Sequence, residues 1–158
     1  MRFLTILLLC AAGLAAMQKY TGPRPPKADL PYLLHADNLV ATEASEATEE
    51  PVKKDILYVV KGPNSPAKTP LASPILLMRA DKLDAGKLEL YRLDSRNGRR
   101  EILFRSNKKN QRPIRLDVTR VGAAADNLYR IEVDESLDAG EYSLTWEGSN
   151  QVFCFAVY

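Results

Sequence analysis

The residues able to support catalysis or metal binding are few in this chain of 158 residues. His35 is the only histidine, and Asp37 follows two positions later, a spacing that places both on one face of a strand. A zinc site needs three or four ligands, and a serine hydrolase needs a histidine base with a nucleophile on a Gly-x-Ser-x-Gly turn, which the sequence lacks. We therefore expect no enzyme, no metal and no cofactor. A carboxylate-pair glycosidase is the alternative left open, although a chain of this length rarely forms a deep cleft.

Charged residues are distributed unevenly along the chain. Residues 92–120 hold ten basic residues and three acidic ones, whereas residues 126–147 hold seven acidic residues and one arginine. Two such segments either attract an anionic partner or pair with each other across a sheet. We do not expect nucleic-acid binding, because aromatic residues that stack on bases do not alternate with the basic ones. The candidate patch for an anionic partner comprises Arg96, Arg99, Arg100, Arg105, Lys108, Lys109 and Arg112.

The N-terminus has the order of parts found in a secretory signal peptide. Arg2 precedes an apolar run from Phe3 to Cys10, and the small residues of "AAGLAA" follow. We assign residues 1–16 to the signal and expect an exported protein, periplasmic or secreted, that does not span a membrane after cleavage. A retained anchor is the alternative, although the uncharged stretch is short for a membrane helix. The mature chain has one cysteine, Cys154, so no internal disulfide forms and the core must supply stability.

Residues 17–54 have the composition of an extended, partly disordered N-terminal arm. The stretch "TGPRPPKADLP" is typical of a tether, and "ATEASEATEEP" of a solvated loop or frayed helix. Between them, "YLLHADNLV" favours a strand, with residues 55–60 as its candidate partner. Residues 55–158 are then expected to form one β-sandwich domain.

Short strands separated by turns account for the chain after Pro74. These segments are rich in β-branched and aromatic residues, and no long amphipathic helix interrupts them. Asn97-Gly98 predicts a type I′ hairpin turn, because both residues tolerate a positive φ. This turn sets Leu93 opposite Ile102 and Tyr91 opposite Phe104, so that four apolar side chains share one face. The sequence therefore predicts an all-β, antiparallel fold.

A second turn, at Gly148-Ser149, predicts the pairing of the last two strands. Large residues fall on one face and small ones on the other, because successive side chains alternate across a sheet. Cys154 is on the small-residue face, where we expect it to be buried and unreactive. The predicted large face comprises Tyr142, Leu144, Trp146, Phe153 and Phe155, and the small face comprises Ser143, Thr145, Val152, Cys154 and Ala156.

The stretch "LDAGEYSL" resembles the tyrosine corner of immunoglobulin-like sandwiches, with Asp138, Gly140 and Tyr142 matching the motif. The resemblance implies that the Tyr142 hydroxyl bonds to backbone upstream, and that the fold is an immunoglobulin-like antiparallel β-sandwich. Leu144 stands where the family has its second cysteine, so no inter-sheet disulfide is implied.

The functional expectation is a non-catalytic exported module that interacts with an envelope protein or anionic polymer. The alternative is a structural or assembly component that acts through strand addition or self-association.

Overall fold

The fold is all-β, as the sequence predicts. The computed structural model describes residues 19–107 and 112–158, so the predicted signal peptide and Lys108 and Lys109 lie outside the described residues. Two short 3-10 helices accompany the strands in these ranges: η1 (Ala85–Lys87) and η2 (Ala124–Asp126). The strands are β1 (Tyr32–His35), β2 (Asn38–Ala41), β3 (Glu43–Glu46), β4 (Thr48–Val52), β5 (Asp55–Lys61), β6 (Lys68–Thr69), β7 (Ile75–Arg79), β8 (Leu88–Arg96), β9 (Arg99–Phe104), β10 (Leu116–Val121), β11 (Leu128–Val133), β12 (Gly140–Trp146) and β13 (Gln151–Val157).

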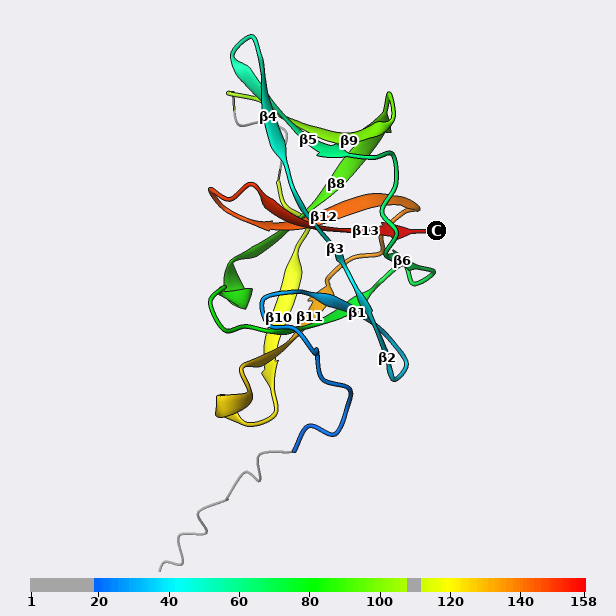
Figure 1. The fold of residues 1–158 in the computed structure, drawn as a ribbon, viewed down its shortest axis with the longest axis vertical. Helices are drawn as coiled ribbons and strands as arrows, with labels where there is room; N and C mark the ends of the chain where they lie inside the picture. The colour runs from blue at the N-terminus through cyan, green and yellow to red at the C-terminus, as the bar shows by residue number, and fades with distance from the viewer. Residues whose placement is uncertain (1–18, 108–111) are drawn as a thin grey trace, which may run out of the picture.

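The strands form two sheets that are antiparallel except where β6 pairs with β13. A five-stranded sheet has the order β10-β11-β7-β1-β2, and an eight-stranded sheet has the order β3-β13-β12-β8-β9-β5-β4 with β6 beside β13. In Figure 1 the five-stranded sheet occupies the lower part, and β4, β5 and β9 lie at the top, with β12 and β13 between them. The arrangement is compatible with a β-sandwich.

The eight-stranded sheet closes on itself. Strands β3 and β4 stand at opposite ends of its order, yet only Ala47 separates them in the chain. They run as one continuous cyan segment in Figure 1, pairing first with β13 and then with β5. The Ala47 amide bonds to the Asn150 carbonyl at 2.8 Å where the segment passes from one partner to the other. We call this arrangement the closed sheet. It has an inner face, whereas the five-stranded sheet stays open.

Both predicted hairpin registers are present. Asn97 and Gly98 have positive φ angles of 52° and 74°, as a type I′ turn requires, and Arg96 pairs with Arg99 across it. In the β12–β13 hairpin, Tyr142 faces Phe155 and Leu144 faces Phe153. The first register follows from its predicted turn. The second is as predicted, but its two-residue turn at Gly148-Ser149 is wrong, because residues 147–150 join the strands and the Ser149 amide donates to the Trp146 carbonyl at 3.1 Å.

The main core fills the space between the two sheets. The large face predicted for the β12–β13 hairpin points into it, and so do apolar residues of the five-stranded sheet. Several of its members, such as Leu33, Leu76 and Phe155, have no exposed surface, as expected of a close-packed interior. We define the main core as Leu33, Ala67, Leu76, Met78, Ala85, Leu88, Leu90, Ile131, Val133, Leu137, Tyr142, Leu144, Trp146, Phe153, Phe155 and Val157.

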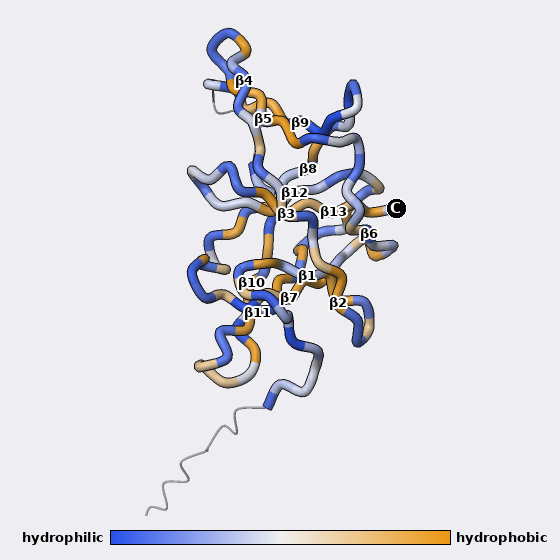
Figure 2. Tube along the Cα trace, viewed as in Figure 1, coloured by the Kyte–Doolittle hydropathy of each residue, from blue (hydrophilic) through white to orange (hydrophobic). Residues whose placement is uncertain are grey.

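A second core lies inside the closed sheet, on the opposite face of β12 and β13. Cys154 belongs to it and is fully buried, as predicted from its place on the small-residue face. Figure 2 shows in orange the hydrophobic stretches of β5 and β9 that cover this face. We define the second core as Ala47, Val60, Tyr91, Leu93, Ile102, Val152 and Cys154, with Tyr58 and Phe104 packed against it.

The region predicted as an N-terminal arm instead contributes four strands. Strand β1 pairs with β2 and β7 rather than with residues 55–60, and the acidic segment predicted as a loop or frayed helix forms β3 and β4. Its alternate residues explain the difference, because Ala47 is buried in the second core and Glu43 meets a buried arginine. Tertiary contacts thus override the composition of the segment. Across the described ranges, no helix has the length and apolarity that crossing a membrane requires.

Candidate functional site

A cavity of about 390 Å³ lies in the second core. Strands β4, β5, β8, β9, β12 and β13 contribute to its wall, together with the β12–β13 turn. This volume lies within the range of pockets that hold small ligands. Its lining includes Ala47, Glu49, Tyr58, Glu89, Tyr91, Phe104, Ser143, Trp146, Glu147 and Val152.

Three aromatic rings line one side of the cavity. The Phe104 ring contacts Tyr58 and Tyr91 edge-on, with centroid distances of 5.2 Å in both pairs. Edge-to-face packing holds each ring in a defined orientation. Strand alternation brings them together, since Tyr58 pairs with Ile102, and Phe104 lies two residues further along β9 on the same face. The cavity therefore has a rigid apolar side suited to a flat or aliphatic ligand.

Three carboxylates lie at the cavity wall. Glu89 accepts a hydrogen bond of 2.9 Å from the Tyr91 hydroxyl, and Glu49 faces Tyr58 across the β4–β5 pair. Burial raises the pKa of Tyr91, and Glu89 and Glu147 raise it further. Burial and Glu49 likewise raise the pKa of Tyr58, so both tyrosines are neutral donors at neutral pH. Among the described residues that line the cavity, none is lysine, arginine or histidine.

Ser143 places a polar atom deep in the same cavity. The residue is 3% exposed, and its buried hydroxyl oxygen has no hydrogen-bond partner within the described ranges. The hydroxyl lies close enough to Cys154 to lower the pKa of its thiol, but sulfur is a weak partner. A buried polar atom without a full partner costs stability unless a ligand or water satisfies it.

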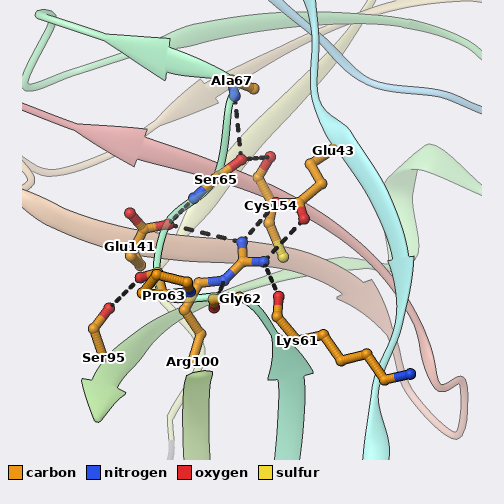
Figure 3. A network of polar contacts seen from close by, with 10 residues as sticks. All are labelled: Glu43, Lys61, Gly62, Pro63, Ser65, Ala67, Ser95, Arg100, Glu141 and Cys154. Atoms are coloured by element: carbon orange, nitrogen blue, oxygen red, sulfur yellow. Dashed lines mark hydrogen bonds and ion pairs between the residues drawn. The ribbon is translucent and has the colours of Figure 1, made fainter. Parts of the chain in front are cut away.

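One end of the inner face of the closed sheet is occupied by a buried ion network centred on Arg100. Arg100 has no exposed side-chain surface, and its guanidinium donates to both carboxylate oxygens of Glu43 at 2.6 and 2.9 Å. It also donates to the Gly62 and Lys61 carbonyls at 3.0 and 2.7 Å, and lies 3.8 Å from Glu141. Figure 3 shows these groups converging from β3, β9, β12 and the segment after β5. The network links strands from across the closed sheet.

Burial governs protonation in this network. It raises the pKa of Glu141, while the Ser65 amide, which donates to its carboxylate at 2.9 Å, and Arg100 lower it. Burial likewise raises the pKa of Cys154 to about 11, and the nearby Arg100 only partly offsets this. The thiolate is the nucleophilic form of cysteine. Cys154 therefore remains a protonated thiol at neutral pH.

A row of polar side chains on alternate residues leads from this network along β12 to the cavity. Glu141, Ser143, Thr145 and Glu147 alternate along the chain, and the three that line the cavity are Ser143, Thr145 and Glu147. Arg100, by contrast, is absent from its lining. The ion network thus lies at one end of the inner face, and the wall carboxylates lie towards the other.

The described residues of the candidate anionic-partner patch do not form one surface. Arg100 is buried, so its place in an exposed patch is wrong, because it shares strand parity with the inward-facing Ile102 and Phe104. Arg99 is held by Glu50 at 2.9 Å and Glu101 at 3.0 Å. Arg96 pairs with Arg99 at the first end of β9, and Arg105 follows its last residue, so the length of β9, about 20 Å by its residue count, separates them. Arg112 is exposed in the connection to β10.

Pairing between the basic and acidic segments is present across the strands. Arg92 contacts Asp138 at 3.4 Å, and Arg115 contacts Asp134 at 3.2 Å. The buried Arg100–Glu141 approach belongs to the same pattern. These pairs account for part of the uneven charge without an external partner.

Tyr142 forms the hydrogen bond expected of it. Its hydroxyl donates to the Asp138 carbonyl at 2.8 Å, while its ring stacks on Phe155 in the main core. Gly140 has a φ of 158°, and a Cβ there would lie 3.1 Å from the Arg92 guanidinium. Asp138 also holds Arg92 through its carboxylate. The three residues Asp138, Gly140 and Tyr142 therefore act together to fix the start of β12.

His35 ends β1 beside the turn that contains Asp37. Its Nε2 atom is buried and has no hydrogen-bond partner among the described residues. No group of three or more potential metal ligands occurs within the described ranges, so His35 and Asp37 are not joined by a third ligand there.

Sequence reasoning missed the cavity although its signals were present. The alternation that puts Ile102 and Phe104 on an inner face also points Arg100 inward. The small residues opposite the large face of the β12–β13 hairpin indicate a layer that is thinly filled. Alternation cannot predict that β3 pairs with β13 and β4 with β5. This pairing closes the sheet and brings Glu43 and Glu49 to this face.

No family model, curated protein or solved structure gives a significant match to this chain. The second-core cavity is therefore the starting point for assigning a function.

Proposed function

We propose that this chain is an exported, non-catalytic binding module that holds a small ligand in the second-core cavity. The observation that carries the proposal is the combination, in one cavity of about 390 Å³, of a rigid aromatic side and the buried, incompletely bonded Ser143 hydroxyl. Binding pockets typically combine apolar walls with a few fixed polar groups. Export is supported by the N-terminal residues 1–16 in sequence, and the immunoglobulin-like relationship by the Tyr142 hydrogen bond.

The proposal is tested by titrating small aromatic fragments of different charge against the mature protein. Trp146 is the only tryptophan in the sequence and borders the cavity, but its ring packs edge-on against Phe153 in the main core. Its fluorescence therefore reports occupancy indirectly, and NMR shifts of the other lining residues report it directly. We expect at least one fragment to change the emission saturably, and NMR shifts to cluster at the cavity lining. A Val152→Phe variant should lose the response because the new ring occupies the cavity.

A folded Val152→Phe protein, checked by circular dichroism, is required for that comparison, and Ala47→Leu is the second filling variant. Fragments that bind wild type and both filled variants equally well would contradict the proposal. So would the absence of any saturable response across the fragment set.

Interaction with an envelope protein or anionic polymer stays a prediction. The exposed Arg96 and Arg112 support it, whereas Arg99 and Arg100 are engaged within the protein. Loss of anionic-polymer binding in an Arg96→Ala, Arg112→Ala double variant would support that partner, and binding that persists unchanged would count against it.

Assembly through strand addition is the second candidate function. The five-stranded sheet favours it, because this sheet is open. Its edge strands β2 and β10 each pair with a neighbour on one side only in the described structure. An unpaired edge is a template for another strand. Size-exclusion chromatography with light scattering tests it, because a monomer at all concentrations would exclude self-association.

A further inference from the structure

We infer that the cavity selects organic cations: amines or quaternary ammonium compounds with a flat or aliphatic apolar body. The inference rests on the proposed function and adds the chemistry of the ligand. Three independent features of the cavity carry it: its carboxylates, its aromatic rings and its buried serine hydroxyl.

The carboxylates give the sign of the ligand's charge. Glu49, Glu89 and Glu147 line one cavity, and the described lining offers no basic side chain to balance them. Glu89 and Glu147 lie near enough to the Tyr91 hydroxyl to act on it electrostatically. Glu89 is half-buried beside Tyr91, and Glu49 and Glu147 are exposed, whereas Glu43 pairs with the buried Arg100. A cation in the cavity would be attracted to all three carboxylates, and most strongly to the half-buried Glu89.

The aromatic rings determine the rest of the ligand. Tyr58, Tyr91 and Phe104 offer apolar surface at fixed angles, and their faces attract cations. A hydrated metal ion gains little from such a wall, whereas an amine with a hydrocarbon body uses both the rings and the carboxylates. The inference is therefore an organic cation and not an inorganic one.

The Ser143 hydroxyl indicates the depth of the site. It lies four positions before Glu147, which follows the end of β12 at Trp146, so the two residues are at most about 13 Å apart. A ligand of modest length lies between the two, with its charged end towards the glutamates and its apolar end towards Ser143.

The test compares three probes of similar shape and different charge: 2-phenylethylamine, 2-phenylethanol and 3-phenylpropionate. Each is titrated against the mature protein, with NMR shifts of the cavity-lining residues as the readout and Trp146 fluorescence as a supporting signal. We expect the amine to bind about tenfold more tightly than the alcohol, and the carboxylate to bind most weakly. Higher ionic strength should weaken the amine alone.

A glutamate variant separates charge from shape. Glu147→Gln should weaken 2-phenylethylamine by about threefold to tenfold and leave 2-phenylethanol unchanged, because only the amine uses the carboxylate. Glu147 is exposed, so the substitution should not affect folding. The matched control is Glu135→Gln, an exposed glutamate in the loop before β12 that is absent from the cavity lining, and it should change neither affinity.

The outcomes distinguish the two proposals. Equal or tighter binding of the alcohol or the carboxylate, blocked in Val152→Phe, would overturn the cation inference and keep the cavity as a binding site. Amine binding that survives in Val152→Phe would place the cation outside the cavity and overturn the cation inference, while the wider fragment set would still decide the proposed function. If none of the three probes binds, the cation inference fails, and the wider fragment set decides the proposed function separately.

Discussion

The two faces of the β12–β13 hairpin differ in how they are filled. On the main-core side, Tyr142, Leu144, Trp146, Phe153 and Phe155 pack against the five-stranded sheet. On the other side, the small residues of the same two strands face the interior of the closed sheet and leave a cavity of about 390 Å³. One hairpin thus supplies both a packed interior and a hollow one. The difference teaches that side-chain volume on alternate positions decides which face stabilises the fold and which is available for a ligand.

The means of stabilisation differ as well. The main core is apolar apart from satisfied groups such as the Tyr142 hydroxyl and the Trp146 indole, which donates to the Asp84 carbonyl at 2.7 Å. The inner face of the closed sheet relies in addition on an ion network centred on Arg100. The following predictions test this contrast, from the largest expected effect to the smallest.

Truncation should cost much more on the packed face than on the hollow one. Phe155→Ala is expected to lower the free energy of unfolding by about 3 to 5 kcal/mol, because a fully buried ring leaves a cavity. Val152→Ala, on the cavity side of the same strand, should cost only about 1 kcal/mol, because Val152 borders a cavity and loses fewer packing contacts. Urea denaturation measures both. Equal costs would mean that the two faces are equally well packed.

Removing the buried cation should destabilise the closed sheet. Arg100→Met leaves the Glu43 and Glu141 carboxylates without their partner and is expected to cost about 3 kcal/mol. The exposed Arg96→Met serves as control and should change stability by less than about 0.5 kcal/mol. Adding Glu43→Gln to Arg100→Met should recover part of the loss. If Arg100→Met is as stable as wild type, the network does not hold this region.

The buried thiol should make stability depend on alkaline pH. The pKa of Cys154 is raised from 9.0 to about 11 in the folded protein, so the unfolded chain loses this proton first as pH rises. Its contribution is complete below the unfolded pKa and is lost as pH rises through the folded one. Relative to Cys154→Ala, wild type should lose about 2 to 3 kcal/mol across this window. Parallel denaturation curves at each pH measure the difference, which would stay constant if the thiol were exposed.

Enlarging a side chain should have opposite effects on the two faces. Val152→Leu extends into the cavity and is expected to stabilise the protein by about 0.5 to 1 kcal/mol. Leu144→Phe enlarges a fully buried main-core residue and should instead destabilise it by about 1 to 3 kcal/mol. Thermal unfolding distinguishes the two signs. Destabilisation by Val152→Leu would show that the cavity is smaller than its lining indicates.

Local sequence determined the hairpins and their faces. Asn97-Gly98 set one register and Gly148 marked the turn region of the other, and alternation then assigned Phe155 to one face and Cys154 to the other. Turn geometry and the two-residue repeat of a strand act over a few residues, so they can be read directly from the sequence. The same rules predicted the all-β class and the burial of Cys154.

Only the tertiary structure decided what the second face contains. The acidic stretch from Glu43 to Glu50 has the composition of a solvated loop, but it pairs with β13 and β5 and closes the sheet. Glu43 is 57 residues from Arg100 in sequence, and Glu49 reaches the cavity from another strand than Glu89 and Glu147. Strand pairing between distant segments is set by the burial of the whole fold, and no local propensity encodes it. The ion network and the cavity therefore exist only in the folded chain.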